Sequence, residues 1–375
     1  MLSYSTQLIN DEDIAEVIKV LKSDFLAQGP KVAQFEQDLC DYTATKYAIT
    51  FNSATSALQA AYSVAGIKKD DEIITTPISF VATSNMFITL GAKPIWCDVK
   101  LDGNIDESQI EQLISSKTKA IVPVDFAGKP VAINIINSIA KKHNLLVIQD
   151  ASHALGSSVK GEKIGSFADM TIFSFHAIKP ITTSEGGAIV TDNEEYAKAL
   201  KLFRSHGMVK KEFWNSDMQS MGYNLRMTEV AAALGSSQLR KLDLFVAKRN
   251  KISTYFDERF KDEKLFLTQK LETDTISSRH LYPIILNSKL HCYKEKIFTS
   301  LQKRDLGVQV HYKPIYQNSF YIEKFAKCSL QVADNFYNSE ISIPCNQTMS
   351  MDDAKYVADT LIDTLKLYST IGCSN

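Results

Sequence analysis

The sequence has almost no excess of charge and no long apolar run. Its 42 lysines and arginines nearly balance its 43 aspartates and glutamates, which leaves a net charge of −1. This balance gives no electrostatic reason to expect nucleic acid or an anionic membrane as a partner. No stretch reaches the roughly 18 apolar residues that span a bilayer, and the N-terminus lacks the basic and apolar regions of a signal peptide. We therefore expect a cytoplasmic protein.

Two common site patterns are missing as well. The six cysteines are scattered without any C-x-x-C spacing, which argues against a zinc site or a disulfide framework, so no metal is expected. No G-x-G-x-x-G follows a strand pattern, which weighs against a dinucleotide-dependent oxidoreductase. A cofactor-sensing regulator would need an additional nucleic-acid-binding module, for which the chain offers no basic segment. A scaffold without catalysis stays an alternative.

The chain does contain a repeated alternation of strand-like and helix-like patterns. Its 375 residues exceed the ~250 at which single cores stop growing, so we expect two domains. Segments with helical apolar spacing, at 53–66, 80–91 and 134–144, separate several short apolar runs. The runs are 47–52, 72–77, 93–99, 120–126, 145–150, 170–175 and 187–192. This order predicts an α/β domain with a mostly parallel sheet over residues 1–245.

The remaining residues, 246–375, are expected to form a smaller α+β domain. A long helix is predicted over about 226–261, where it would cross from one domain to the other. After it come a strand-like HLYPIIL segment, a helix near 293–304, the strand-like VQVHYKP segment and a terminal helix near 351–367.

The stretch SFHAIKPITTSEGG places Lys179 in a short connection between two strand patterns. Ligands of parallel sheets bind at the carboxyl ends of the strands, so a cation in this position could have a chemical role. Polar or aromatic residues follow other strand patterns at the same expected edge. They are the run Asn52-Ser53-Ala54-Thr55-Ser56, then Ser79 and Phe80, Asp150 with His153, and His176.

Each of these residues also has an ordinary structural explanation. Ser53 could serve only as a helix N-cap, and Phe80 could belong to the core. Asp150 could be a structural acceptor at a strand end, and His153 a buried, hydrogen-bonded side chain. Lys179 could be a surface cation on a turn. Taken one by one, these alternatives stay open.

Taken together, the residues match the needs of one cofactor, pyridoxal phosphate. This cofactor needs a lysine amine, an acid against its pyridine nitrogen, an anion cradle for its phosphate and a flat side chain over its ring. Lys179 and Asp150 supply the first two groups. The helix opening at 54–55 would offer free N–H groups to the phosphate. Phe80 or His153 would cover the ring.

The same motifs resemble the sugar-nucleotide aminotransferases of the DegT/StrS type, which have the fold of aspartate aminotransferase (fold type I). The resemblance covers essentially the whole chain and rests on SFHAIKPITTSEGGAIV, QDASHALGS, FNSATSAL, RSHG and GYNLRMTEVAAALG. It implies an aminotransferase that uses pyridoxal 5′-phosphate, with Lys179, Asp150 and His153 as catalytic residues. It also implies that the cofactor is bound by Ala54, Thr55, Phe80, Asp150, Ser174 and Lys179, and by Asn224 of a second subunit.

The resemblance further implies a homodimer with two shared active sites. Arg226 would approach the substrate from the second subunit, and the other candidate substrate contacts are Gln28, His176, His311 and Tyr312. Two departures from the family pattern, Asp125 and Tyr316, stand where a histidine is frequent in relatives. They put the finer sugar contacts in doubt.

The segments TTPISFVAT, VDFAGKP, GNIDE and VQVHYKPIY are similar to the branch of the family that serves pseudaminic acid synthesis. The implied reaction transfers an amino group from L-glutamate to C4 of a UDP-linked 4-keto-6-deoxy-N-acetylhexosamine. Other nucleotide-linked 4-keto-6-deoxy sugars, of the bacillosamine, legionaminic or perosamine type, stay alternatives. A dehydratase of the same fold is disfavoured, because the 3-dehydratases of this group carry a histidine in place of the lysine.

Overall fold

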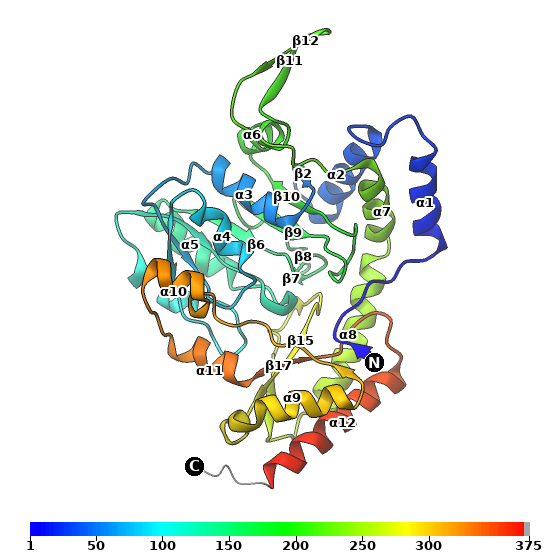
Figure 1. Cartoon of the computed structure of the whole chain (residues 1–375), viewed down its shortest axis with the longest axis vertical. Helices are drawn as coiled ribbons and strands as arrows, with labels where there is room; N and C mark the ends of the chain where they lie inside the picture. Colours follow the sequence, from blue (N-terminus) through cyan, green and yellow to red (C-terminus); the bar gives the residue numbers. More distant parts are fainter. Residues whose placement is uncertain (371–375) are drawn as a thin grey trace.

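The computed structural model describes residues 1–370, and a seven-stranded sheet lies in its larger part (Figure 1). The strand order is β2-β10-β9-β6-β5-β3-β4, and β10 alone runs antiparallel to its neighbours in this sheet. The strands are β2 (Tyr47–Phe51), β3 (Glu72–Thr75), β4 (Lys93–Trp96), β5 (Thr118–Val122), β6 (Leu146–Asp150), β9 (Met170–Ser174) and β10 (Gly187–Thr191). Six of them fall within predicted runs and β5 begins two residues before its run, so the mostly parallel α/β fold is confirmed.

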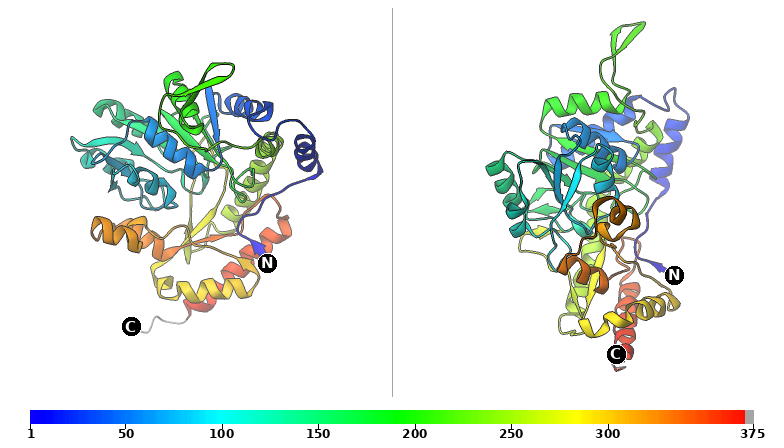
Figure 2. Two further views of the ribbon diagram at one scale, coloured as in Figure 1. Left: turned by 45° about the horizontal axis from the view of Figure 1, so that its top comes forward. Right: turned by 60° about the vertical axis from the view of Figure 1, so that its left-hand side comes forward.

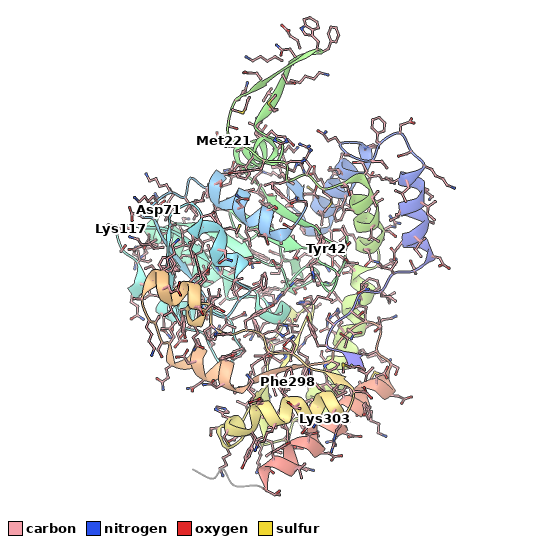
Figure 3. The ribbon with its side chains drawn as sticks, in the orientation of Figure 1. Tyr42, Asp71, Lys117, Met221, Phe298 and Lys303 are labelled. Atoms are coloured by element: carbon pink, nitrogen blue, oxygen red, sulfur yellow. The ribbon has the colours of Figure 1, made fainter. Side chains whose placement is uncertain are left out.

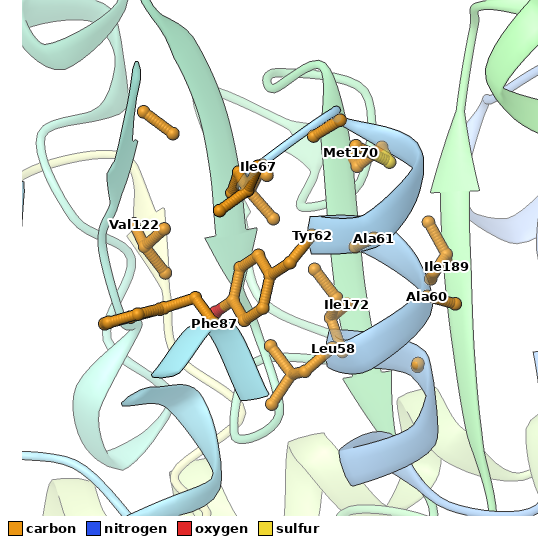
Figure 4. Close-up of a cluster of buried hydrophobic side chains, with 14 of the residues drawn as sticks. Leu58, Ala60, Ala61, Tyr62, Ile67, Phe87, Val122, Met170, Ile172 and Ile189 are labelled. Atoms are coloured by element: carbon orange, nitrogen blue, oxygen red, sulfur yellow. The ribbon is translucent and has the colours of Figure 1, made fainter. Parts of the chain in front are cut away.

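Helices cover both faces of this sheet because successive strand residues point to opposite sides. On one face, α3 (Ala54–Val64) and α4 (Ala82–Ile88) pack on Ile172 and Ile189 (Figure 4). Helix α6 (Glu194–Arg204) joins the same cluster through Ala197 and Leu200. On the other, α2 (Pro30–Thr43), α5 (Ile133–His143) and α7 (Glu229–Leu239) pack on the alternate positions, such as Phe173 and Val147. The predicted helices at 53–66, 80–91 and 134–144 correspond to α3, α4 and α5.

A second core surrounds a three-stranded antiparallel sheet of order β13-β15-β17. Its elements are α8 (Leu242–Arg259), β13 (Phe266–Thr268), β15 (Tyr282–Leu286), α9 (Lys294–Lys303), β17 (Glu340–Ile343) and α12 (Met351–Ser369). The N-terminal strand β1 (Leu2–Ser3) pairs in parallel with β16 (Leu306–Gly307), so the start of the chain joins this unit. The domain boundary after residue 245 stays a prediction. It falls inside α8, whose Phe245 packs in the larger part and whose Phe256 packs in the smaller core.

Two local predictions are wrong. The helix expected over 226–261 is divided into α7 and α8, because Thr228 caps α7 and α8 begins only at Leu242. The break allows α8 to leave the large sheet and enter the second core. The segment VQVHYKP forms no strand, and only Gln309 makes an isolated bridge, to Ser342. Pro314 at its end has no N–H to extend a ladder.

The remaining elements lie around these two cores (Figure 2). They are α1 (Asp11–Leu21), β7 (Ser158–Val159), β8 (Glu162–Lys163), β11 (Met208–Glu212), β12 (Asn215–Met218), β14 (Thr275–Ile276), α10 (Ser319–Phe325) and α11 (Gln331–Ser339). The β11–β12 hairpin projects from the body, with Phe213 and Trp214 at its tip and Met221 near its base (Figure 3). Within residues 1–370 no helix is long and apolar enough to cross a membrane.

Candidate active site

A cavity of about 680 Å³ opens where the carboxyl ends of the central strands meet the start of α3. Most of the predicted site residues line it. They are Ala54, Thr55, Phe80, Asp150, His153, Ser174, His176, Lys179, His311 and Tyr312. The structure thus brings together residues from five separate parts of the sequence, including one from the segment between β16 and α10. Their chemical roles stay predictions that the geometry can support or oppose.

Lys179 lies in the turn between β9 and β10, where its backbone N–H donates to the carbonyl of His176 at 2.9 Å. Its Nζ reaches the cavity and lies 3.5 Å from Nε2 of His280. Burial lowers the pKa of Lys179 to about 8, although the negative charge of Asp150 opposes this shift. A substantial share of the amine is therefore neutral near physiological pH, as a nucleophile or a proton acceptor requires.

Asp150 ends β6 as a buried carboxylate held by three donors. Oδ1 accepts from the backbone N–H and the hydroxyl of Ser152, at 3.1 and 2.6 Å, and Oδ2 accepts from the Thr83 hydroxyl at 2.7 Å. Thr83 is in turn 2.8 Å from the hydroxyl of Ser79. All partners are neutral, so the carboxylate keeps its charge available for a cationic group in the cavity.

His153 stands beside this pair as a neutral, buried imidazole. Burial, followed by the charge of Lys179, lowers the pKa of His153 well below its ordinary value. Its Nδ1 accepts from the backbone N–H of Ala127 at 3.3 Å, and its Nε2 lies 3.2 Å from the Tyr312 hydroxyl. The ring of His280 packs against it with centroids 4.5 Å apart. These contacts fix the ring at the edge of the cavity.

The start of α3 forms a cradle suited to an anion. Ser53 caps the helix by accepting from the Ser56 N–H at 3.1 Å, whereas the backbone N–H groups of Ala54 and Thr55 have no hydrogen-bond partner among residues 1–370. A Cβ on Gly187 would come within 2.5 Å of the Ala54 nitrogen, so only glycine lets β10 approach this helix end. Two free N–H groups at a helix N-terminus favour a phosphate.

The residues present fit pyridoxal phosphate. The amine of Lys179, the carboxylate of Asp150, the cradle at α3 and the exposed ring of Phe80 all border one cavity. When bound, this cofactor supplies an electrophilic carbon and a protonated ring that accepts electrons, which allows an amino group to be carried between two substrates. Lys179 would hold it, Asp150 would keep its ring nitrogen protonated and the α3 cradle would bind its phosphate.

Three predicted residues do not line the cavity of this chain. Gln28 and Asn224 are exposed, and Arg226 is partly exposed. Asn224 lies in an extended segment that bridges to Ser205, four residues before Thr228. Asn224 does not cap the following helix, because Thr228 does so by accepting from the Ala231 N–H. Within residues 1–370 no hydrogen bond of the exposed Asn224 side chain is found.

Sequence reasoning missed Thr83 and His280, which contact Asp150 and Lys179. Thr83 could have been found because it follows Ser79 by four residues and lies in the first turn of the helix predicted over 80–91. His280 carried no such signal, because it meets Lys179 only through the packing of the two units. Asp125 and Tyr316 lie outside the cavity lining: Asp125 accepts from Val131 and Gln149, and Tyr316 donates to Asp334. Burial raises the pKa of Asp125 to about 7.

Comparison with known proteins identifies the same chemistry. Residues 7–362 match the model of the DegT/DnrJ/EryC1/StrS aminotransferase family. The chain is 50% identical over 369 residues to the UDP-4-amino-4,6-dideoxy-N-acetyl-beta-L-altrosamine transaminase of Campylobacter jejuni, with 98% of each chain covered.

Two solved structures extend the likeness to three dimensions. PseC of Helicobacter pylori, an aminotransferase involved in the biosynthesis of pseudoaminic acid, superimposes with a TM-score of 0.95 at 44% identity, covering 98% of this chain and 99% of PseC. The PLP form of the sugar aminotransferase Spr1654 from Streptococcus pneumoniae gives a TM-score of 0.92 at 29% identity, covering 97% and 98%. The predicted family, fold type I, aminotransferase class and cofactor are confirmed.

Proposed function

The chain belongs to the DegT/DnrJ/EryC1/StrS aminotransferase family, and we propose that it aminates C4 of a UDP-linked 4-keto-6-deoxy-N-acetylhexosamine. The amino donor would be L-glutamate, and the product would serve pseudaminic acid synthesis. The observation that carries the reaction class is the shared cavity of Lys179, Asp150 and the α3 cradle. The sugar is supported by the 50% identity to the Campylobacter transaminase.

The chain's own residues would divide the work as follows. Lys179, with its lowered pKa, would take the proton from the α-carbon of the donor and deliver it to the cofactor carbon on the other side of the transferred nitrogen. Ser152 and Thr83 hold the Asp150 carboxylate in place by donating hydrogen bonds to it. Its negative charge would stabilise positive charge on the ring nitrogen. Phe80 and His153 would confine the ring, and Ser174 would join Ala54 and Thr55 in holding the phosphate.

A second copy of the chain would complete the site. Asn224 and Arg226 are available to a partner because neither lines the cavity of its own chain. The surface near the N-terminus also carries several exposed apolar side chains, among them Ile14, Leu21 and Phe25, with exposed fractions of 48%, 58% and 54%. Such a patch is suited to a subunit interface. We therefore propose a homodimer with shared sites; the cytoplasmic location stays a prediction.

The test is an assay with glutamate and a panel of nucleotide-linked 4-keto sugars. The L-arabino UDP sugar should be the best substrate, ahead of its D-xylo epimer and of a GDP-linked 4-keto-6-deoxymannose. A tenfold higher kcat/KM for either competitor, about 1.4 kcal/mol in transition-state binding, would reassign the substrate within the same reaction class.

A further inference from the structure

The cavity wall between β16 and α10 carries two adjacent polar residues, His311 and Tyr312. Their neighbours behind the wall determine which atoms carry hydrogens. This polarity can be derived from the hydrogen bonds of each side chain in turn.

The proton of His311 is located by a chain of contacts that runs to β17. The Ser342 hydroxyl donates to Oε1 of Glu340 at 2.5 Å, and Glu340 Oε2 accepts from the backbone N–H of His311 at 2.7 Å. The same Ser342 oxygen lies 2.9 Å from His311 Nδ1. A serine hydroxyl has a single hydrogen, so an oxygen that donates to Glu340 can only accept from His311. Nδ1 therefore carries the proton.

The other ring nitrogen of His311 is consequently an acceptor. Burial, followed by the charge of Lys179, lowers the pKa of His311 to about 3, so the ring holds one proton only. Within residues 1–370 no hydrogen-bond partner is found for Nε2 of His311, and the ring lines the cavity. The lone pair of Nε2 is thus available to a ligand.

Tyr312 has the opposite polarity. Because His153 Nδ1 accepts from the Ala127 N–H, the proton of the neutral His153 ring is on Nε2, and it donates to the Tyr312 oxygen. The Tyr312 hydrogen is then free to turn towards the cavity. Burial raises the pKa of Tyr312, so the hydroxyl stays protonated.

We propose that His311 Nε2 accepts a hydrogen bond from the sugar hydroxyl beside the reacting carbon. The Tyr312 hydroxyl donates to a carbonyl oxygen of the sugar that flanks this hydroxyl. Ser342 and Glu340 act as positioning residues, because they touch the sugar only through His311. The assignment rests on the proposed function. A 4-keto-6-deoxy-N-acetylhexosamine has one free hydroxyl, at C3, flanked by the keto group at C4 and the acetamido group at C2.

Glu340 makes the polarity dependent on pH. Burial raises the pKa of Glu340 to about 7, whereas the charge of Lys294 on α9 favours its ionised form. Lys179 is the charged group that acts on His311 from the cavity. Below this pKa, a protonated Glu340 can donate to Ser342, whose hydrogen then turns to Nδ1 and leaves Nε2 as a donor. The KM for the sugar should therefore rise as the pH falls from about 8 to about 6.

The experiment compares Ser342→Ala and Tyr312→Phe with the conservative Ser342→Thr in the cofactor-loaded enzyme at about pH 8. Loss of one hydrogen bond should raise the KM for the sugar about fivefold in Ser342→Ala and in Tyr312→Phe, and Ser342→Thr should stay near the wild type. The half-reaction with glutamate alone should be unchanged in Ser342→Ala. With a 3-deoxy sugar, Ser342→Ala should not raise the KM further, because the hydroxyl that donates to His311 is missing.

Nitrogen-15 NMR of the histidine rings measures the tautomer of His311, which would not change if Ser342 had a purely structural role. His311 should be an Nδ1–H tautomer in the wild type and a mixture in Ser342→Ala. An Nε2–H tautomer in the wild type, or an unchanged sugar KM in both Ser342→Ala and Tyr312→Phe, would overturn the proposal. If the wild type converts no 4-keto sugar, the proposed function fails separately, and the tautomer still decides the polarity.

Discussion

At the residue scale, the chemistry depends on an amine whose proton affinity is reduced by its surroundings. Because burial lowers the pKa of Lys179 to about 8, the neutral fraction of its amine grows as the pH rises through that value. We expect the rate of covalent cofactor attachment to cofactor-free protein to increase with pH up to about 8 and then level off. An ordinary lysine would continue to respond up to about pH 10. Stopped-flow absorbance measures this rate.

The matched variants for this prediction are Lys179→Ala and Lys198→Ala. Lys179→Ala should lose turnover and covalent attachment while still binding the cofactor noncovalently through the α3 cradle. Lys198 forms a surface ion pair with Glu194, so Lys198→Ala should leave turnover and covalent attachment unchanged. Turnover at the wild-type level in Lys179→Ala would refute the assignment of this residue.

The residues of the site differed in how far the sequence could predict them. Lys179, Asp150 and His153 follow predicted strands in short motifs, so their shared edge was deducible. His280 was not, because its contact with Lys179 spans 101 positions and depends on how the second unit packs. Thr83 donates to Asp150 only because α4 lies in the right position. The buried Tyr62 fixes that position by donating to the Thr83 carbonyl at 2.8 Å.

At the scale of elements, the close approach of β10 to α3 forms the phosphate cradle. Gly187→Ala would place a Cβ 2.5 Å from the Ala54 nitrogen and 2.6 Å from its Cα, so the helix start must shift. We expect the dissociation constant for pyridoxal phosphate to rise at least about tenfold, since the N–H groups would no longer converge on the anion. Fluorescence titration of cofactor-free protein provides the measurement.

The control for this change is Gly66→Ala. A Cβ at Gly66 meets no atom within 4 Å, but its φ of +69° is strained for alanine. This variant should lose about 1 kcal/mol of stability and keep its cofactor affinity. Equal affinities in the two variants would mean that the contact between β10 and α3 does not shape the cradle.

The strands of the central sheet and the three helices expected between them were predictable, whereas elements such as the β11–β12 hairpin were not predicted and two predictions were wrong. Strand composition and helical spacing located the whole central sheet, because most residues of each run are buried. The division between α7 and α8 was not predicted, because apolar residues continue across it. Only the geometry of the two cores requires a change of direction. VQVHYKP has strand composition, yet its residues face the cavity instead of extending a ladder.

At the scale of the whole molecule, a buried arginine connects the N-terminal segment with the smaller unit. Arg249 on α8 donates to the carbonyls of Arg279, His280 and Cys345, and to the hydroxyl of Ser5. Burial lowers the pKa of Arg249 to about 10. Arg249→Met leaves these carbonyls without a donor and should cost about 3 kcal/mol of the free energy of unfolding. Urea denaturation measures the loss.

Arg259, at the end of the same helix, supplies the comparison. It pairs with Asp359 at 3.1 Å on the surface, so Arg259→Met should cost less than about 1 kcal/mol. Similar losses in the two variants would show that the buried contacts of Arg249 contribute no more than a solvated ion pair.

The assembly of two chains is the last property that belongs to the whole molecule, and it can be tested by complementation. Lys179→Ala removes the amine of a site, whereas a variant with both Asn224→Ala and Arg226→Ala would remove the groups that we propose a second copy supplies. In a heterodimer of the two variants, one site lacks all three side chains and the other keeps them all. An equal mixture should therefore recover about one quarter of wild-type activity, because about half of the dimers are mixed and each has one intact site. If mixed dimers form, as native mass spectrometry can establish, and remain inactive, the sites are not shared between subunits.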